Sequence, residues 1–394
     1  MKIKKLLSAL SAVLLGLSIL PAAAHAAEPY SVTDNDDGTV SVKWTDASAV
    51  TAEIPGEIGG KPVTALDERC FDGCKELESI VIPETVTQIR DYAFQGCVRL
   101  GSVEIPASVE EIGNFCFEGC ISLEAIEVDD HNENYCDEDG ILYTRNQTEL
   151  VRYPAAKEGT EYTIGKECGM IAAWGFTNCR YLEKVKMEKV NSIGADCFMG
   201  CTELRNVTLS DGIPELIGAS FAKCSKLRTI HMPSNLEKIG DRCFFGDESL
   251  KEVKLPETLE SIGEMAFYGC TSLETVYVPG KVKSIGANGI GITVASDGSN
   301  VVQENFKLEM PVGSYAMKYA KENDIPYQGK ISQNVVLLVL VGLVLVILLV
   351  VGIVTTVRNN KAKQRAEEER IAQEQKEKML AERRAERKRK KEQK

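Results

Sequence analysis

The feature that most constrains this chain is a phenylalanine that recurs every 22 or 23 residues through its central part. The recurring residues are Phe71, Phe94, Phe117, Phe176, Phe198, Phe221, Phe244 and Phe267. The one irregular gap, 59 residues from Phe117 to Phe176, equals one period plus an insert of 36 residues. A fixed period of this length predicts a solenoid, because each repeat is a single rung that buries its apolar edge only against its neighbours.

Other apolar positions keep the same phase. An Ile or Leu precedes each Phe by five residues, a Leu follows it by six, and alternating pairs such as Ile80 and Ile82 come next. Alternation predicts a short strand with one buried face, and the Pro that often follows ends the strand because it has no backbone donor. The segment from Ile to Cys, for example 262–270, predicts one turn of helix between glycines.

The pattern I-G-x-x-A-F-x-G-C-x-x-L-x-x-V-x-I-P resembles the BspA-type leucine-rich repeat of bacterial surface proteins, and 112–128 and 262–278 match it nearly residue for residue. The resemblance covers roughly residues 50–295. It implies a repeat solenoid, a leucine-rich-repeat-like stack of short parallel strands and short helical turns, at the cell surface. It also implies adhesion and host contact without catalysis. At the flanks it implies an opening hairpin over 30–44, a closing helix within 313–327, and a hairpin inside the insert.

Both ends of the chain carry apolar runs with basic flanks. Residues 1–26 hold three Lys, an apolar run and an Ala-His-Ala site, which predicts a secretory signal peptide cut after Ala26; an N-terminal membrane anchor is the alternative. The uncharged run 335–357 would extend ~35 Å as a helix, enough for a hydrocarbon core of ~30 Å. The basic residues of 358–365 predict a cytoplasmic tail. We therefore expect a single-pass plasma-membrane protein with an extracellular body.

These assignments divide the chain into consecutive segments. They are a signal peptide (1–26), an N-terminal hairpin cap (27–52), leucine-rich repeats (53–294) with an insert at about 129–164, a C-terminal cap and stalk (295–334), a transmembrane helix (335–357) and a basic cytoplasmic tail (358–394). The formal charge of −12 is segregated, because +3 on the signal peptide and +7 on the tail leave −22 on the body. So acidic a body is not expected to bind nucleic acid.

Thirteen cysteines in an exported chain suggest disulfides, but eleven of them fall in two columns of the repeat. One column follows the Phe by three residues, with Asp247 as an exception, and the other precedes it by one, where other repeats have small residues. Since free Cys packs as a small hydrophobe, we interpret both columns as reduced core residues. Their C-x3-C pairs also have a metal-ligand spacing, but no His accompanies them and we expect no metal. Cys136 and Cys168 belong to neither column and form a candidate disulfide pair.

The body carries no recognisable catalytic motif. His131 in the insert and His231 in a strand have no orienting partner in the sequence, and no phosphate loop or nucleophile elbow is present. Residues 34–38 faintly resemble a calcium loop but lack its closing Glu, which favours a hairpin turn. We interpret the acidic residues of the insert as a solvated tip. We therefore expect no catalytic residues, no enzyme activity and no cofactor.

Outward strand positions predict an interaction face. In L-x-x-V-x-I the named residues point inward, so the residues between them form outward columns across the rungs. In the second half of the body these columns and their flanks form a basic stripe, which we predict to bind a ligand: Lys184, Lys186, Arg205, Thr208, Arg228, His231, Lys251, Lys254 and Tyr277. Ordinary solvated strands are the alternative, and the insert at 129–153 is the other candidate place.

The combined features predict a non-enzymatic single-pass cell-surface protein whose solenoid serves adhesion or protein–protein interaction. Its extracellular ligand would be a protein or a glycan. The tail is rich in helix formers, and its basic run 383–391 suggests anionic lipid or a cytoplasmic protein as a partner; a solvated charged helix is the alternative. A surface receptor and an envelope-structural protein, each acting through the basic tail, remain alternative functions.

Overall fold

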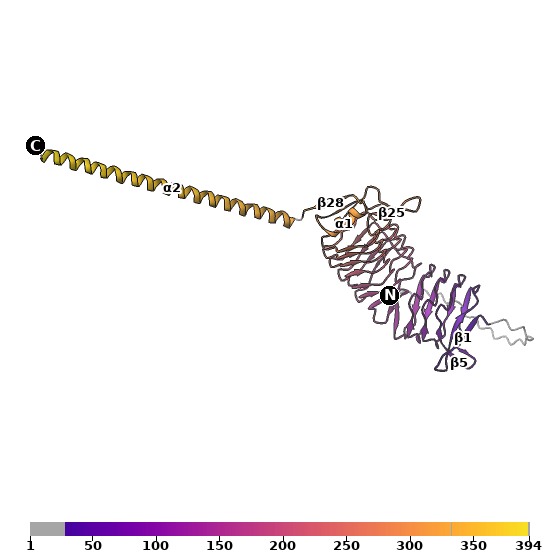
Figure 1. Ribbon diagram of the computed structural model, residues 1–394. Helices are drawn as coiled ribbons and strands as arrows, with labels where there is room; N and C mark the ends of the chain where they lie inside the picture. Colours follow the sequence, from indigo (N-terminus) through magenta and orange to yellow (C-terminus); the bar gives the residue numbers. More distant parts are fainter. Residues whose placement is uncertain (1–27, 332, 393–394) are drawn as a thin grey trace, which may run out of the picture.

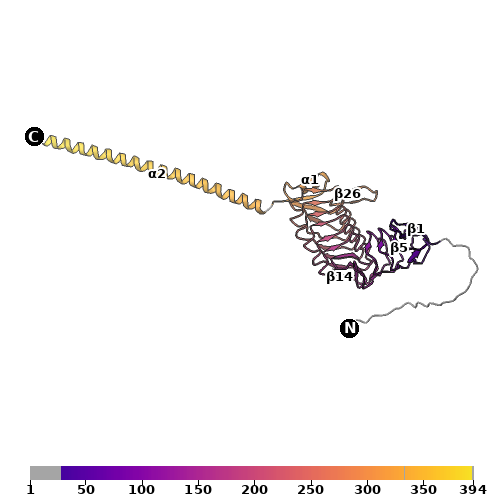
Figure 2. The ribbon, with the colours of Figure 1, turned by 90° about the horizontal axis from the view of Figure 1, so that it is seen from below.

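The computed structural model describes residues 28–331 and 333–392. The predicted signal peptide lies outside the described residues. The predicted solenoid is confirmed: short strands stack in parallel from the N-terminal hairpin to the last strand, and one long helix, α2 (Gln333–Glu392), follows (Figure 1). Seen from below, the rungs before and after the insert form two stacks that point in different directions and meet near β14 (Glu161–Thr163) (Figure 2).

Each regular rung supplies two strands, which stack in two columns. The first column contains the predicted V-x-I strands: β3 (Thr51–Glu53), β6 (Ser79–Val81), β8 (Ser102–Ile105), β10 (Ala125–Val128), β14 (Glu161–Thr163), β16 (Lys184–Lys186), β18 (Asn206–Thr208), β20 (Thr229–His231) and β23 (Thr275–Tyr277). The second column contains strands that are mostly two residues long: β5 (Lys61–Leu66), β7 (Gln88–Ile89), β9 (Glu111–Ile112), β13 (Glu149–Arg152), β15 (Met170–Ile171), β17 (Ser192–Ile193), β19 (Glu215–Leu216), β21 (Lys238–Ile239), β22 (Ser261–Ile262) and β24 (Ser284–Ile285).

The second column was not predicted from the sequence. Its regular strands pair residues one period apart, as Ile89 pairs with Ile112. Two residues are too few to show the alternation that identifies a strand, so the pairing partner in the next rung decides their structure.

The segment predicted as one helical turn is a run of tight turns. Gln95 N donates to Tyr92 O (2.9 Å) and Cys97 N donates to Phe94 O (3.1 Å), so each bond spans three residues. Tyr92 has φ 59°, and the residue two before the Phe lies in the same left-handed region in most rungs. A non-glycine residue in that region interrupts a right-handed helix, which is why the turn is not continued.

Buried phenylalanine rings run along the axis of the solenoid. Phe71 and Phe94 have ring centroids 5.3 Å apart, and Phe198 and Phe221 stack at 5.2 Å with planes only 3° apart. All recurring Phe residues are buried. The apolar core consists of two clusters, one within 40–142 and one within 141–325, which meet at the insert.

The cysteine columns lie in this core, as interpreted from the sequence. Cys136 is half-buried and the other twelve cysteines are buried, and all thirteen are free thiols in the structure. Most thiols of the column after the Phe donate to a Phe carbonyl of the preceding rung, for example Cys120 Sγ to Phe94 O (3.1 Å) and Cys201 Sγ to Phe176 O (3.0 Å). This column therefore adds a weak hydrogen bond between rungs to its apolar packing.

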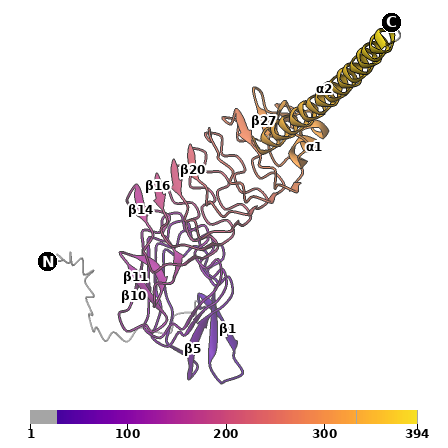
Figure 3. The same cartoon turned by 90° about the vertical axis from the view of Figure 1, so that its left-hand side faces the viewer.

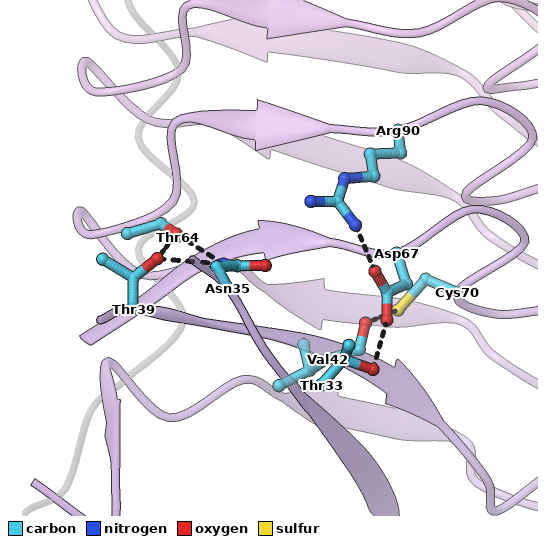
Figure 4. Close-up of polar contacts among 8 residues, drawn as sticks. All are labelled: Thr33, Asn35, Thr39, Val42, Thr64, Asp67, Cys70 and Arg90. Atoms are coloured by element: carbon cyan, nitrogen blue, oxygen red, sulfur yellow. Dashed lines mark hydrogen bonds and ion pairs between the residues drawn. The ribbon is translucent and has the colours of Figure 1, made fainter. Parts of the chain in front are cut away.

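The N-terminal end is closed by the hairpin implied by the family resemblance. β1 (Tyr30–Asp34) and β2 (Val40–Trp44) pair antiparallel, and β2 pairs with β5, which also pairs with β4 (Glu57–Ile58). Figure 4 shows Asp67 accepting hydrogen bonds from Arg90 Nη1 (2.5 Å) and Thr33 Oγ1 (3.4 Å). The same view shows Asn35, Thr39 and Thr64 bonded to one another. The hairpin is thereby tied to the first rungs.

The C-terminal end is closed by a small mixed unit. It contains β25 (Ile292–Val294), β26 (Asn300–Val302), β27 (Lys307–Pro311), α1 (Tyr315–Glu322) and β28 (Tyr327–Lys330). α1 corresponds to the implied closing helix, and its Tyr319 hydroxyl lies 3.2 Å from both Ile290 N and Ile290 O. α2 then runs for 60 residues without a break, which corresponds to about 90 Å. Its apolar part is long enough to cross a membrane.

Asp247 replaces a Cys in the core and is fully buried. Its Oδ1 accepts a hydrogen bond from Cys224 N (2.8 Å), but Oδ2 has no partner in the part of the chain that the structure describes. Burial raises the pKa of this carboxyl well above its ordinary value. The folded protein therefore holds a proton that the unfolded chain releases near pH 4.

We predict that Asp247→Cys stabilises the solenoid at pH 7 and much less at pH 4. A raised folded-state pKa means that stability is complete below the unfolded pKa and falls as pH rises, by up to about 1.4 kcal/mol per pH unit. Denaturant unfolding of the full chain between pH 4 and 8 measures the effect, with the exposed Glu248→Gln as control. An unchanged pH dependence in Asp247→Cys would contradict this account.

Candidate functional site

The predicted ligand residues lie on the first strand column of the second half. β16, β18 and β20 pair in parallel and in register, so that Lys186, Thr208 and His231 follow one another across three rungs. Figure 3 shows β14, β16 and β20 along one side of the solenoid. These three residues are exposed, whereas the central residue of each strand is buried. We call the outward residues of β16, β18 and β20, together with residues 252 and 254 of the next rung, the strand face.

Part of the predicted set surrounds one shallow hollow. Thr208, His231 and Lys254 line it together with Asn206, Thr229 and Glu252, above the apolar side chains of Val207, Ile230 and Met232. Asn206 Nδ2 donates to Thr229 Oγ1 (2.6 Å) at its edge. The neighbouring rungs therefore bring donors, acceptors and charges of both signs to one place.

The remaining predicted residues lie beside this hollow. Arg205, Arg228 and Lys251 occupy the same position in consecutive rungs, directly before the strand, and Arg228 N donates to Arg205 O (2.9 Å). Tyr277 lies one rung beyond Lys254, and Lys330 Nζ is 5.6 Å from the centroid of its ring. Tyr277 is thus half-buried under the C-terminal cap.

The basic residues of the strand face are largely ion-paired. Nζ of Lys184 lies 2.5 Å from Glu161, Nζ of Lys186 lies 2.9 Å from Glu188, and Nζ of Lys254 lies 3.3 Å from Glu252. The hydrogen bond that Lys184 donates to Glu161 raises the pKa of Lys184, and the bond that Lys186 donates to Glu188 lowers the pKa of Glu188.

Arg205 is paired in the same way with Glu183, at 3.2 Å. The interpretation as a basic stripe is therefore corrected: the surface is mixed in charge. The sequence pattern places Glu252 beside Lys254 on the outward side of one strand, but it missed Glu161 and Glu183, which come from an adjacent rung. Exposed pairs of this kind contribute at most about 1 kcal/mol, so an incoming partner can exchange them.

The insert contains a rung that sequence reasoning missed. Tyr153 precedes Phe176 by 23 residues, stacks on it at 5.1 Å, and donates from its backbone N to Gly175 O (2.7 Å), as every recurring Phe except Phe117 does to the next rung. The 59-residue gap is therefore two periods plus 13 residues. The signals were a Tyr in the Phe position and Leu150, which lies three residues before it where regular rungs have five.

The rest of the insert forms the predicted hairpin. β12 (Ile141–Thr144) pairs antiparallel with β13 and also with β11 (Tyr135–Glu138). Cys136 Sγ, on β11, donates to Thr144 O (3.4 Å), and the buried Cys168 Sγ donates to Met170 O (3.1 Å). Both cysteines are free thiols in the structure, and a disulfide between Cys136 and Cys168 stays a prediction. Within residues 28–331 and 333–392, no three His, Cys, Asp or Glu side chains are grouped to hold a metal ion.

These features define a class of protein: a leucine-rich-repeat-like solenoid with one exposed strand face. The chain belongs to the family described as the BspA type leucine rich repeat region, which matches it in six copies over residues 61–143 and 169–290. Repeat proteins of this kind are typically binding proteins, and the family is associated with adhesion or protein–protein interaction. A comparison with curated proteins found no match.

Solved structures with a similar arrangement come from several bacteria. A leucine rich cell surface protein from Faecalibacterium prausnitzii A2-165 is 24% identical, with 68% of this chain and 96% of that chain covered and a TM-score of 0.48. A leucine-rich repeat protein from Eubacterium ventriosum is 22% identical, with 66% and 92% covered and a TM-score of 0.46. The pneumococcal vaccine antigen PcpA is 16% identical, with 77% and 97% covered and a TM-score of 0.49.

We predict that the native chain reacts with a thiol reagent at no more than one cysteine. Burial keeps the other twelve from the reagent and raises the pKa of thiols such as Cys120, to about 12, so little reactive thiolate forms. After denaturation without reductant, thirteen thiols should react, or eleven if Cys136 and Cys168 are paired in the cell. Mass spectrometry of the labelled full chain counts them, and fewer than nine would show that the core columns hold disulfides.

Proposed function

We propose that this protein is a non-enzymatic, single-pass cell-surface protein that presents its solenoid for adhesion or protein–protein interaction. The observation that carries the proposal is the union, in one chain, of a BspA-type solenoid with an exposed strand face and an apolar helix long enough to cross a membrane. A solenoid offers an extended surface that grows with the number of rungs, which suits a large partner.

The strand face supports binding to a protein or glycan surface. It is open and polar. Little free energy is lost when its exposed ion pairs are replaced by contacts with a partner. Mixed charge favours a partner whose own charges complement the pattern, because a misplaced like charge opposes binding. In this proposal the chain is divided at the boundaries that the sequence predicts, from the N-terminal cap (27–52) to the cytoplasmic tail (358–394).

The proposed orientation places the body outside and the tail inside. It is supported by the basic residues of 358–365, which directly follow the apolar run 335–357. A signal peptide over 1–26 would direct the body through the membrane, and the apolar run would then stop the transfer. The protein would be held in the plasma membrane by this one helix.

The tail favours a receptor as the second candidate function. Because α2 is unbroken, residue 383 lies about 40 Å along the helix beyond residue 357. A helix that continued straight from the membrane would hold the basic run 383–391 several Debye lengths, of about 8 Å each, from the lipid surface. This distance favours a cytoplasmic protein over anionic lipid as its partner. Cross-linking in cells tests this alternative, with charge reversal of 387–391 as control.

We predict that protease added to intact cells removes the body and spares a C-terminal epitope. The peptide bonds of 28–331 would be accessible outside, while the membrane would protect 358–394. Immunoblotting with antibodies to each region, before and after lysis, measures this. Survival of the body on intact cells together with loss of the tail epitope would refute the orientation.

We predict that reversing Lys184, Lys186 and Lys254 together to Glu weakens adherence of cells that display the full chain by about tenfold. The assay uses immobilised mucin and matrix proteins at two salt concentrations, because removing these charges should also lower the salt dependence. The matched control reverses Lys238, Lys281 and Lys283, which are exposed on other parts of the rungs. Two of these control residues are also ion-paired, with Glu215 and Glu260.

Both triple variants should retain the thermal stability of the parent chain, because exposed ion pairs add little. Equal adherence of the strand-face variant and the control variant would show that the ligand binds elsewhere. The insert at 129–153 would then be the next candidate.

A further inference from the structure

A pocket of about 170 Å³ lies at the break in the solenoid, away from the strand face. Residues 112–118 of the Phe117 rung line one side and residues 172–174 line the other, with Tyr135, Glu149 and Arg152 of the insert between them. The pocket exists because the intervening rung is short. Two residues separate Leu150 from Tyr153, where four separate Ile from Phe in a regular rung, so no turn fills the space.

The walls of this seam pocket are aromatic. Tyr92, Phe115 and Trp174 occupy the same left-handed turn position, with φ between 56° and 64°, and are half-buried. Tyr92 and Phe115 stack at 5.0 Å with planes 15° apart, but Phe115 meets Trp174 edge to face, at 5.7 Å and 82°. The missing turn therefore interrupts a surface column of rings, and its last two rings border the cavity.

Some polar side chains that line the seam pocket do not form hydrogen bonds with one another. The Glu149 side chain is half-buried, and among the described residues it has no hydrogen-bond or ion-pair partner. The Tyr135 hydroxyl accepts a hydrogen bond from Ile112 N (3.0 Å), and in the described part of the chain its own proton has no acceptor. Asn114 adds an amide, whose only hydrogen bond among the described residues is a long one to Asp91 Oδ1 (3.5 Å).

Arg152 lies at the base of the seam pocket and is 4% exposed. Its guanidinium donates to Thr177 O (3.1 Å) and to Trp174 O. The bond to Thr177 O replaces one that a glycine amide of the preceding rung supplies elsewhere, as Gly96 N does to Glu118 O. Its Nε has no partner, and no carboxylate of the described residues pairs with it. A buried cation is therefore left without a counter-charge beside the cavity.

We propose that the seam pocket binds one neutral pyranose ring of a glycan. The C–H face of a sugar ring packs on aromatic side chains, and its hydroxyls both donate and accept hydrogen bonds. Glu149 offers an acceptor, the Tyr135 hydroxyl and Asn114 offer donors, and the cavity is of single-ring size rather than the 300 Å³ or more of typical drug-sized sites. A sugar would satisfy these groups without adding charge.

Charge selects against other ligands. An anion would face both Glu118 and Glu149, which line the seam pocket, and a cation would come close to the unpaired charge of Arg152. A purely apolar ligand would bury Glu149 and the Tyr135 hydroxyl without partners, which is costly. Because the seam pocket and the strand face share no residue, this proposal stands or falls independently of the proposed function.

The two tryptophans of the chain make a direct test possible. Trp44 is buried in the N-terminal hairpin, so a full chain with Trp44→Phe reports only on Trp174. This protein, kept in a detergent without a sugar headgroup, is titrated with methyl glycosides of glucose, galactose, mannose and N-acetylglucosamine. We expect at least one of them to change the fluorescence saturably, with a Kd near 1 mM, about what a single small ring can supply.

Saturation-transfer NMR on the parent chain gives a second readout. Phe115→Ala and the nearly isosteric Glu149→Gln should each weaken binding by about tenfold, and Tyr315→Ala, at an exposed residue of α1 that lines neither the seam pocket nor the strand face, should leave it unchanged. Native thiol burial verifies that each variant is folded. The proposal is overturned if no neutral glycoside binds by either method, if only glucuronate or glucosamine binds, or if Glu149→Gln binds as well as the parent.

Discussion

Stacking of one buried phenylalanine ring on the next is the contact on which the rest of this structure depends. The rings lie about 5 Å apart, close to the spacing of paired strands, so a ring that contacts its neighbour brings both strand columns into hydrogen-bonding register. No rung could bury its ring alone, which makes the stack cooperative. The thiols that bond to Phe carbonyls and the buried Asp247 lie in the same core and depend on the same spacing.

The single irregular rung shows how much follows from a small change in chain length. Tyr153 continues the stack towards Phe176, so the second half of the stack begins inside the insert. Its turn is two residues short, however, and Arg152 has to supply a donor that a backbone amide supplies elsewhere. The charge of Arg152 is buried there without a partner among the described residues. The space left by the missing turn is the seam pocket. One defect in the repeat thus creates the most enclosed polar and aromatic site of those described above.

The charged residues of the strand face and those of the long helix are positioned by different structural features. Along the strand face each rung adds the same outward positions, so charges of neighbouring rungs meet and neutralise one another, as Lys184 and Glu161 do. Binding there would depend on a pattern of charges more than on net charge. In α2 the helix is continuous from the apolar run to the basic run, which makes the distance between them a property of the helix itself.

The sequence by itself determined the solenoid, the phenylalanine stack, the buried cysteine columns, the outward positions of β16, β18 and β20, and the hairpins at the start and in the insert. All but the hairpins follow from residue type at a fixed spacing along one chain, and the hairpins follow from the resemblance to the family. Only the tertiary structure decided the two-residue strands, the rung at Tyr153, the acidic partners of Lys184 and Arg205, and the seam pocket. These features depend on which residues of different rungs become neighbours. The sequence pattern does not show those neighbours, because it does not give the path of the insert. Interactions between rungs are set by register, and register exists only once the rungs are stacked.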